Sequence, residues 1–476
     1  MSQPLSAESI GPIGMVQGLI NDFFAFIHPL TPFPHEPSFR QAFAERRDLQ
    51  DKSFLALLAS MIGALVASFP RRPRLLLKQY HQQAQFPTHM DLVLRCEQVC
   101  DQARGPGYLK KLDLDVQDAA TSYFIGLTGA YTYRIDQFRM HLAESLTIIK
   151  LLHLHKGDDV LLSHFNRPAV GYNDHNESAP QNRKHDLITI EMGRRIFWTI
   201  FVGIKSLGQF NPGFDELIIP PPTPARPYPP LPKEVDDQCI QVDQIYEQPR
   251  HVVPLITGFN TNVRIYRSYT ALDRVEYSYD ISKHEWDRQR RLLDNCLKEC
   301  KRALEGVPSE LTVWPRKPPQ MQGGQPGGMY PGAMGGMSGF GGPDSFGFGQ
   351  FDGTRAEQYE IQKANIYASQ LSTRSYLVEK YWNLWEANRK IKAQSASTQS
   401  SAVNSPGFGP AMLDGMPQQT SPTSGNMVDI MTDRDMIQER ELIIKDLLHV
   451  LTSIQQIHME PSADSFVSVP STLFTK

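Results

Sequence analysis

The sequence predicts an all-α protein built from many helices. Apolar residues recur at helical spacing through most of the 476 residues, whereas the alternation typical of β-strands is rare. Hydrophobic residues make up 40% of the chain, and the deficit lies in two polar or glycine-rich stretches, so the remainder can bury a core. We therefore expect a large multi-helix body with two disordered low-complexity insertions.

The first helix is predicted over residues 15–28, after a weakly patterned and loose segment of residues 1–14. Pro29 should end this helix, because proline lacks an amide donor and disfavours helical backbone in the residue before it. The prolines that follow favour an extended segment, which we expect to pack through the rings of Phe33 and Phe39.

Further helices follow along the chain. Asp51 or Ser53 is expected to cap a helix whose apolar run covers residues 54–69. The remaining helical patterns cover residues 80–103, 115–155 (two helices), 191–208, 241–277, 282–304, 356–392 and 435–458, with a polar loop at 156–185 and an irregular proline-rich crossing at 211–233.

Two segments interrupt this pattern. Residues 316–353 are rich in Gly, Met and Pro, and residues 393–430 are rich in Ser, Gln and Pro. Neither can bury enough apolar surface to offset chain entropy, so both are predicted to be disordered. The main domain then covers residues 15–315, a helix at 354–392 continues it, and residues 431–476 form a C-terminal helix and tail. The phenylalanines of the first insertion could alternatively make it an interaction segment that contacts a partner protein.

Composition argues against several classes of protein. The net charge of −3 is not the footprint of a nucleic-acid binder, and the largest basic cluster, residues 71–74, is interpreted as a solvated loop. Five cysteines in a long chain do not suggest a disulfide scaffold. No signal core is present, and the strongest apolar run, residues 54–69, is short for a membrane span, so we expect a soluble intracellular protein without a membrane partner.

Three short segments occur in a fixed order: FFAFIHPLTPFPHEPSF at residues 23–39, EMGRRIFW at 191–198 and LPKEVDD at 231–237. Together they resemble the regulatory (middle homology) domain of fungal zinc-cluster transcription factors of the xylanolytic-activator type. The matching residues are His28, Pro29, Pro34, His35, Phe39, Glu191, Arg194, Arg195, Trp198, Pro232, Asp236 and Asp237. Gly193 stands where many members of that family carry a third basic residue.

The motif residues have a mainly structural interpretation. Glu191 and Arg195 are four residues apart and can pair along one helix face. Arg194 or Arg195 could also reach the acidic pair at residues 236–237 and hold the proline-rich loop against the helix. Trp198 is expected on the apolar side. The alternative is that these residues bind a small effector directly.

No metal, catalytic or cofactor-binding residues are predicted. His28 and His35 have no cysteine or carboxylate at ligand spacing, so we interpret them as packing or hydrogen-bonding residues. Two cysteine pairs are each four residues apart on predicted helices and are interpreted as core: Cys96 with Cys100, and Cys296 with Cys300. An enzyme is not expected, because the P-loop, G-x-S-x-G, dinucleotide and paired-histidine metal patterns are absent.

The resemblance implies a nuclear regulator of RNA polymerase II transcription that controls a metabolic gene set, forms homo- or heterodimers and responds to a small-molecule inducer. DNA binding in that family needs an N-terminal zinc cluster of six cysteines, and this chain has no cysteine before Cys96. Zinc and DNA contact are therefore expected only through a missing N-terminal domain. The alternative is a co-regulator without a zinc cluster, which acts by heterodimerising with a full-length factor.

Overall fold

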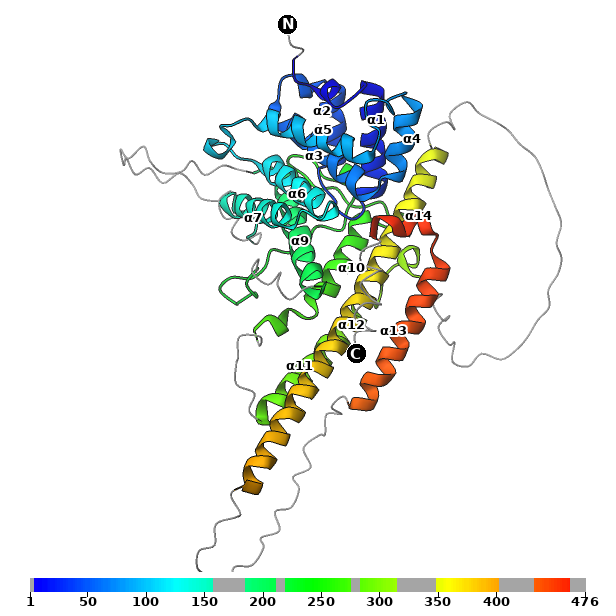
Figure 1. Cartoon of the computed structure of the whole chain (residues 1–476). Coiled ribbons are helices and arrows are strands. Elements are labelled where there is room, and N and C mark those ends of the chain that lie inside the picture. The colour runs from blue at the N-terminus through cyan, green and yellow to red at the C-terminus, as the bar shows by residue number, and fades with distance from the viewer. Residues whose placement is uncertain are drawn as a thin grey trace, which may run out of the picture. The chain divides into compact units, whose positions relative to one another are not determined.

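Helices dominate the computed structural model, which describes residues 4–156, 185–210, 219–274, 283–314, 348–401 and 432–462 (Figure 1). Within these ranges β-structure is limited to two isolated bridges, Thr223 with Arg226 and Ile240 with Ile245, and no strand forms. The predicted all-α class is confirmed. Most of the two predicted insertions and the predicted loop at 156–185 lie outside the described residues.

The chain divides into two compact units. The first contains Met1–Val263, Gly306–Tyr367 and Val450–Ala463, and the second contains Arg264–Glu305, Ala368–His449 and Asp464–Lys476. This division falls inside the segment for which we predicted a single main domain. Helices that cross a boundary, such as the one containing Tyr367 and Ala368, therefore contribute residues to both units.

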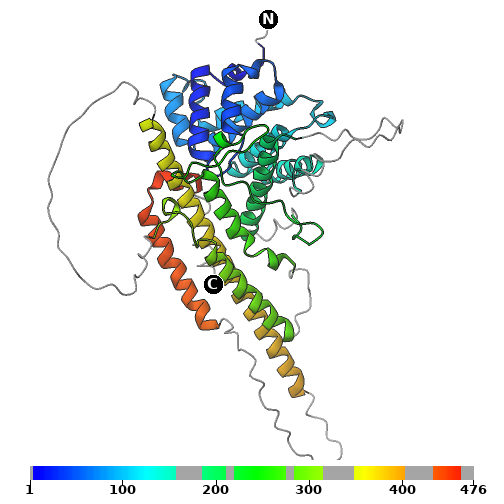
Figure 2. The same ribbon diagram turned by 180° about the vertical axis from the view of Figure 1, so that it is seen from behind.

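The first unit contains most of the helices. They are α1 (Ile13–Asp22), α2 (Glu36–Ala44), α3 (Lys52–Ser68), α4 (Arg71–Gln79), α5 (His89–Arg104), α6 (Val116–Tyr131), α7 (Ile135–Leu151), α9 (Leu187–Phe210), most of α10 (Leu255–Arg267) and α14 (Gln456–Met459). Helix α3 is its central element and packs against α5 and α6, while α6 packs against α7 (Figures 1 and 2). Residues 54–66 of α3 are buried without exception, as expected for a helix that is apolar on every side.

Local sequence signals place several helix ends. The carboxylate of Asp51 accepts hydrogen bonds from the backbone N–H groups of Ser53 (2.9 Å) and Phe54 (3.1 Å), so Asp51, one of the two predicted caps, is the cap of α3. Helix α1 passes into a π-helical segment, Phe23–Ile27, which stops just before Pro29. The predicted pair of helices within residues 115–155 is also confirmed, as α6 and α7.

The second unit is built from α11 (Lys283–Arg302), the part of α12 (Phe348–Ser401) from Ala368 onward, and α13 (Asp433–Ser453) up to His449 (Figure 2). Arg374 is buried and holds two helices together, because its guanidinium contacts the carboxylates of Glu439 (2.7 Å) and Asp446 (2.7 Å) on α13.

Several predicted boundaries were wrong. Residues 4–14 are ordered rather than loose, because the side chains of Ala7 and Ile10 are fully buried and the N–H of Ala7 donates to Asp48 (2.9 Å). The basic cluster at residues 71–74 forms the first turn of α4 rather than a loop, since proline is tolerated in a first turn.

Three of the long helices differ in length from their predictions. The segment predicted at 80–103 is helical only from His89, and the one predicted at 241–277 begins at Leu255, directly after Pro254. Helix α12 extends from Phe348 to Ser401 and therefore enters both predicted insertions, which are shorter than the composition suggested.

In the part of the chain that the structure describes, no single helix is both long and apolar enough to cross a membrane. Helices α3 and α4 reach the required length and hydropathy only when taken together, and the chain bends by 113° between them.

Candidate functional site

The three sequence segments meet at Asp237, in the first unit. Arg195 of α9 donates to one carboxylate oxygen of Asp237 (2.5 Å), and the N–H of Glu36 donates to the other (2.9 Å). The side chain of His35 bonds the backbone carbonyl of Asp237 (2.8 Å), and Nε2 of His28 lies 3.6 Å from its carboxylate. Residues separated by about 200 positions in the chain thus form one buried polar cluster, which we call the Asp237 cluster.

Charge and burial set the protonation of this cluster. Burial opposes ionisation of Asp237, but the charge of Arg195, the neighbouring imidazoles of His28 and His35 and the N–H of Glu36 outweigh it and lower the pKa of Asp237 to about 2. Burial lowers the pKa of His28, although the charge of Asp237 opposes the change. Asp237 is therefore an anion, and His28 is a neutral imidazole whose Nε2 lies 3.1 Å from the carbonyl oxygen of Pro34.

The two arginines of the second segment have different partners. Arg194 pairs with Glu191, three residues earlier, and Glu191 also accepts a hydrogen bond from the backbone N–H of Lys233 (3.0 Å). The predicted pair between Glu191 and Arg195 was wrong, because Arg195 instead reaches Asp237 and the carbonyl of Pro32 (3.0 Å). Burial raises the pKa of Glu191, which the charge of Arg195 and the Lys233 N–H oppose. The predicted contact from this helix to the acidic pair is thus made by Arg195.

Trp198 is fully buried on the apolar side of α9, as predicted. Its ring lies edge-on to the rings of Phe197, Phe201 and Tyr228, with centroids 5.3–5.5 Å apart. Its indole N–H donates to the carbonyl of Pro230 (2.9 Å) at the end of the proline-rich crossing. Trp198 therefore fixes this crossing against the helix by packing and by one hydrogen bond.

The third segment is held from a second side. The carbonyl of Pro232 accepts a hydrogen bond from the side chain of Asn260 (2.9 Å) on α10. The carboxylate of Asp236 contacts Arg355 of α12 (2.6 Å) and accepts a hydrogen bond from the side-chain amide of Gln248 (2.8 Å). The backbone N–H of Asp236 donates to the amide oxygen of the same Gln248 side chain (2.8 Å). Asp236 and Asp237 are adjacent in the chain, yet they bind arginines from two different helices.

The remaining motif residues have structural positions. Phe39 packs between the rings of Phe24 (5.7 Å) and Phe54 (5.1 Å). The carbonyl of Pro29 accepts a hydrogen bond from Gln362 (3.0 Å), and the Phe33–Pro34 peptide bond is cis. His28 and His35 form hydrogen bonds, and among the described residues no group of three His, Cys, Asp or Glu side chains could hold a metal ion.

The four cysteines that are spaced in pairs along predicted helices are free thiols and are buried, in agreement with their interpretation as core residues. Burial raises the pKa of Cys100 and of Cys300 to about 12 and raises that of Cys96 as well, so these thiols are protonated and unreactive at neutral pH.

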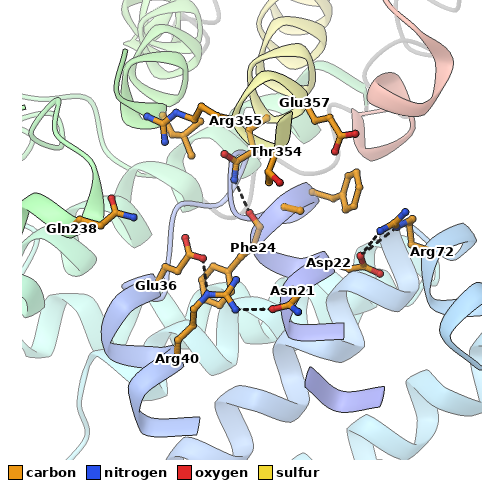
Figure 3. Close-up of a pocket in the computed structure, with 14 residues that line it drawn as sticks. Asn21, Asp22, Phe24, Glu36, Arg40, Arg72, Gln238, Thr354, Arg355 and Glu357 are labelled. Carbon is orange, nitrogen blue, oxygen red and sulfur yellow. Dashed lines mark hydrogen bonds and ion pairs between the residues drawn. The ribbon is translucent and has the colours of Figure 1, made fainter. Parts of the chain in front are cut away.

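An open cavity of about 570 Å³ lies beside the Asp237 cluster (Figure 3). A second cavity of about 30 Å³ includes His28, Arg195 and Asp237 in its wall, and four residues line both cavities: Glu36, Gln238, Leu255 and Arg355. Figure 3 shows Arg355, Thr354 and Glu357 of α12 along one side of the larger cavity, with Arg40, Asn21 and Asp22 along the other.

The sequence did not point to this cavity. Arg355 and Gln358 lie at the start of α12, more than 100 residues from their partners Asp236 and Phe24. The only local signal for Arg355 was its place at the start of an amphipathic pattern. Comparison with known proteins adds no relative: no protein-family model, no curated protein and no solved structure matches this chain.

Proposed function

We propose that this chain is the effector-responsive regulatory domain of a nuclear transcription regulator that controls a metabolic gene set. The observation that carries the proposal is the Asp237 cluster, in which all three segments of the resemblance contact one another. Each of the three motifs taken alone is weak support for the resemblance. Their residues contact one another in one buried cluster, which supports reading them together.

The proposal includes a mechanism of population shift. An effector in the cavity beside the cluster would contact Glu36 and Arg355, which are bonded to Asp237 and Asp236 respectively. A ligand that binds one conformation of these segments better than another shifts the balance between the two. Two conformations with different affinities are sufficient for the domain to report the effector to a partner.

DNA contact is assigned elsewhere. The five cysteines of this sequence are scattered between positions 96 and 300 and form no cluster of six. In the proposal, a zinc-cluster segment outside this sequence, or a partner factor that carries one, binds DNA. No reaction is assigned to the chain.

A reporter experiment tests the proposal. The chain is fused to a heterologous DNA-binding domain and expressed in a fungal host with a reporter gene under the matching operator. We expect reporter transcription to change relative to the DNA-binding domain alone, and the fusion to be nuclear. The variant Asp237→Ala should lose this effect, whereas the surface variant Arg71→Gln should keep it.

Two results would count against the proposal. If the fusion leaves transcription unchanged in every growth medium tested, the chain is not a regulatory domain that acts by itself. If it acts only when co-expressed with a zinc-cluster factor that it co-purifies with, the co-regulator alternative is correct.

A further inference from the structure

The open cavity beside the Asp237 cluster has a polar wall with fixed charges. Its fourteen lining residues include three arginines and three acidic residues, and they come from α1, the π-helical segment, α2, α4, α12 and the chain around Gln238 and Leu255: Asn21, Asp22, Phe24, Ala25, Phe26, Glu36, Arg40, Arg72, Gln238, Leu255, Thr354, Arg355, Glu357 and Gln358. Three of these lining residues, Phe24, Ala25 and Phe26, belong to the π-helical segment, and such segments are common at functional sites. The carbonyl of Phe24 in this segment is bonded by Gln358 (3.1 Å).

Two of the arginines lie over aromatic rings and pair with carboxylates that line the same cavity. The guanidinium of Arg40 lies 4.7 Å from the ring centroid of Phe24 and contacts Glu36 at 2.7 Å. The guanidinium of Arg72 lies 5.1 Å from the ring centroid of Phe26 and contacts Asp22 at 3.0 Å. A ligand would therefore meet guanidinium groups that are already ordered, which lowers the entropic cost of binding.

The third arginine is the most deeply buried of the three. Arg355 contacts Asp236 at 2.6 Å and donates to the carbonyl of Val253 (2.7 Å). Within the described residues, Nη1 of Arg355, Nη2 of Arg40 and Nη1 of Arg72 have no hydrogen-bond acceptor. Each arginine is thus neutralised by one carboxylate and retains N–H groups for a further acceptor.

Glu357 breaks this balance. Glu357 belongs to α12 and lines the same cavity, and its side chain is exposed. In the described part of the chain it pairs with no basic residue. Because the other lining charges are paired, Glu357 gives the cavity one unmatched negative charge. The arginines of the wall therefore offer N–H donors to a ligand carboxylate, and Glu357 offers a negative charge to a positively charged ligand group.

From this arrangement we infer that the cavity binds a small zwitterion of the amino acid class. Its carboxylate accepts hydrogen bonds from the open N–H groups of Arg40 and Arg355, and its ammonium faces Glu357. A dianion would be repelled by Glu357, and a simple amine would leave the arginine N–H groups without an acceptor. This inference rests on the proposed function for its consequence, since the zwitterion would be the effector.

The position of the cavity gives such a ligand a route to the rest of the chain. Arg355, Glu357 and Gln358 all belong to α12, which is part of the first unit up to Tyr367 and of the second unit from Ala368. A ligand in the cavity would therefore contact side chains of α12, a helix that contributes residues to both units.

Titration calorimetry on the purified full chain tests the inference. The probes are the twenty common α-amino acids, each compared with its N-acetyl form and its carboxamide form. We expect at least one amino acid to bind, and both blocked forms of it to bind about tenfold more weakly or worse, because each loses one charge-assisted contact. If none binds, or if the blocked forms bind equally well, the inference is overturned.

Matched variants locate the site. Glu357→Gln and Arg40→Gln should each weaken binding about tenfold. The controls are Glu360→Gln and Arg47→Gln, whose side chains carry the same charges, lie outside the lining and pair with Lys363 and Asp51 respectively. Equal loss in a variant and its control would overturn the inference. Binding that persists in calorimetry while the reporter ignores the same amino acid would instead count against the proposed function.

Discussion

The guanidinium of Arg195 and the carboxylate of Asp237 lie 2.5 Å apart, with 1% and 8% of their side chains exposed. They are 42 residues apart in the chain and join α9 to the loop that follows the proline-rich crossing. An ion pair at this depth is costly to assemble, because both charges lose their hydration. It survives because backbone groups of Pro32 and Glu36 supply further hydrogen bonds to the two side chains.

Removing one member of this pair should destabilise the first unit strongly. Asp237→Leu leaves the Arg195 charge buried without its partner, and we expect the free energy of unfolding to fall by about 3–5 kcal/mol. Urea denaturation followed by circular dichroism measures this loss. The control Arg71→Gln removes an exposed contact to Glu460 (3.2 Å) and should cost less than about 1 kcal/mol.

The double variant Arg195→Met with Asp237→Leu completes this test. Because it removes both buried charges, its loss should be smaller than the sum of the two single losses. Additive losses would mean that the two side chains stabilise the fold independently.

Acid should weaken the fold through His28. The pKa of His28 is lower in the folded chain than its usual value of 6.5, so the unfolded chain binds more protons as the pH falls. The stabilisation is fully present above pH 6.5 and is lost progressively below it. Denaturation midpoints measured between pH 7.5 and 5 should therefore decrease, and this decrease should be smaller in His28→Gln. The exposed His251 provides the control, and His251→Gln should leave the pH profile unchanged.

Asp237 should add a second loss of stability at lower pH. Its pKa falls from 3.8 to about 2 on folding, so its contribution is present above pH 3.8 and disappears as the pH falls toward 2. Asp237→Asn should remove this low-pH step from the profile. A step of unchanged size in that variant would assign it to other carboxyl groups.

Gly193 is required by close packing. A Cβ atom at this position would lie 2.6 Å from both Cβ and Cδ1 of Leu154, a side chain with 0% exposure. Gly193→Ala should therefore lower the free energy of unfolding by about 1–3 kcal/mol. The control lies in the same helix: nothing lies within 4 Å of a Cβ atom at Gly203, so Gly203→Ala should be neutral or stabilising by about 0.5–1 kcal/mol.

Combining Gly193→Ala with Leu154→Gly, which removes the Cβ atom of Leu154 together with the rest of its side chain, tests the same contact. The new methyl group would occupy part of the space that Leu154 leaves, so the double variant should lose less than the two single variants together. This packing also explains why a third basic residue, common at this position in the family that the segment resembles, has no room here.

The cysteines should differ sharply in reactivity. Cys239 is half-buried, whereas the other four are buried in helices: Cys96, Cys100, Cys296 and Cys300. Brief alkylation of the native chain with iodoacetamide, followed by mass spectrometry, should modify Cys239 first and the remaining four only in denaturant. Rapid native labelling of the pair Cys96 and Cys100 would contradict their place in the core.

The sequence alone determined the helical class, the start of α3 with Asp51 or Ser53 as its cap, and the apolar role of Trp198. These follow from local rules: side-chain spacing within a helix, a carboxylate that bonds the first N–H groups, and an aromatic ring on an apolar face. The sequence also predicted that a basic residue of the second segment would reach the acidic pair of the third, which Arg195 and Asp237 confirm.

Tertiary structure alone decided which charges meet. The choice between Arg194 and Arg195 depends on how α9 is rotated against its neighbours, and spacing along the chain does not contain that rotation. Arg355 reaches Asp236 across 119 residues, and Ala7 bonds Asp48 across 41 residues, so neither contact leaves a local pattern. Helical periodicity records which face of a helix is buried, whereas the partner of a buried charge is fixed only when distant helices pack together.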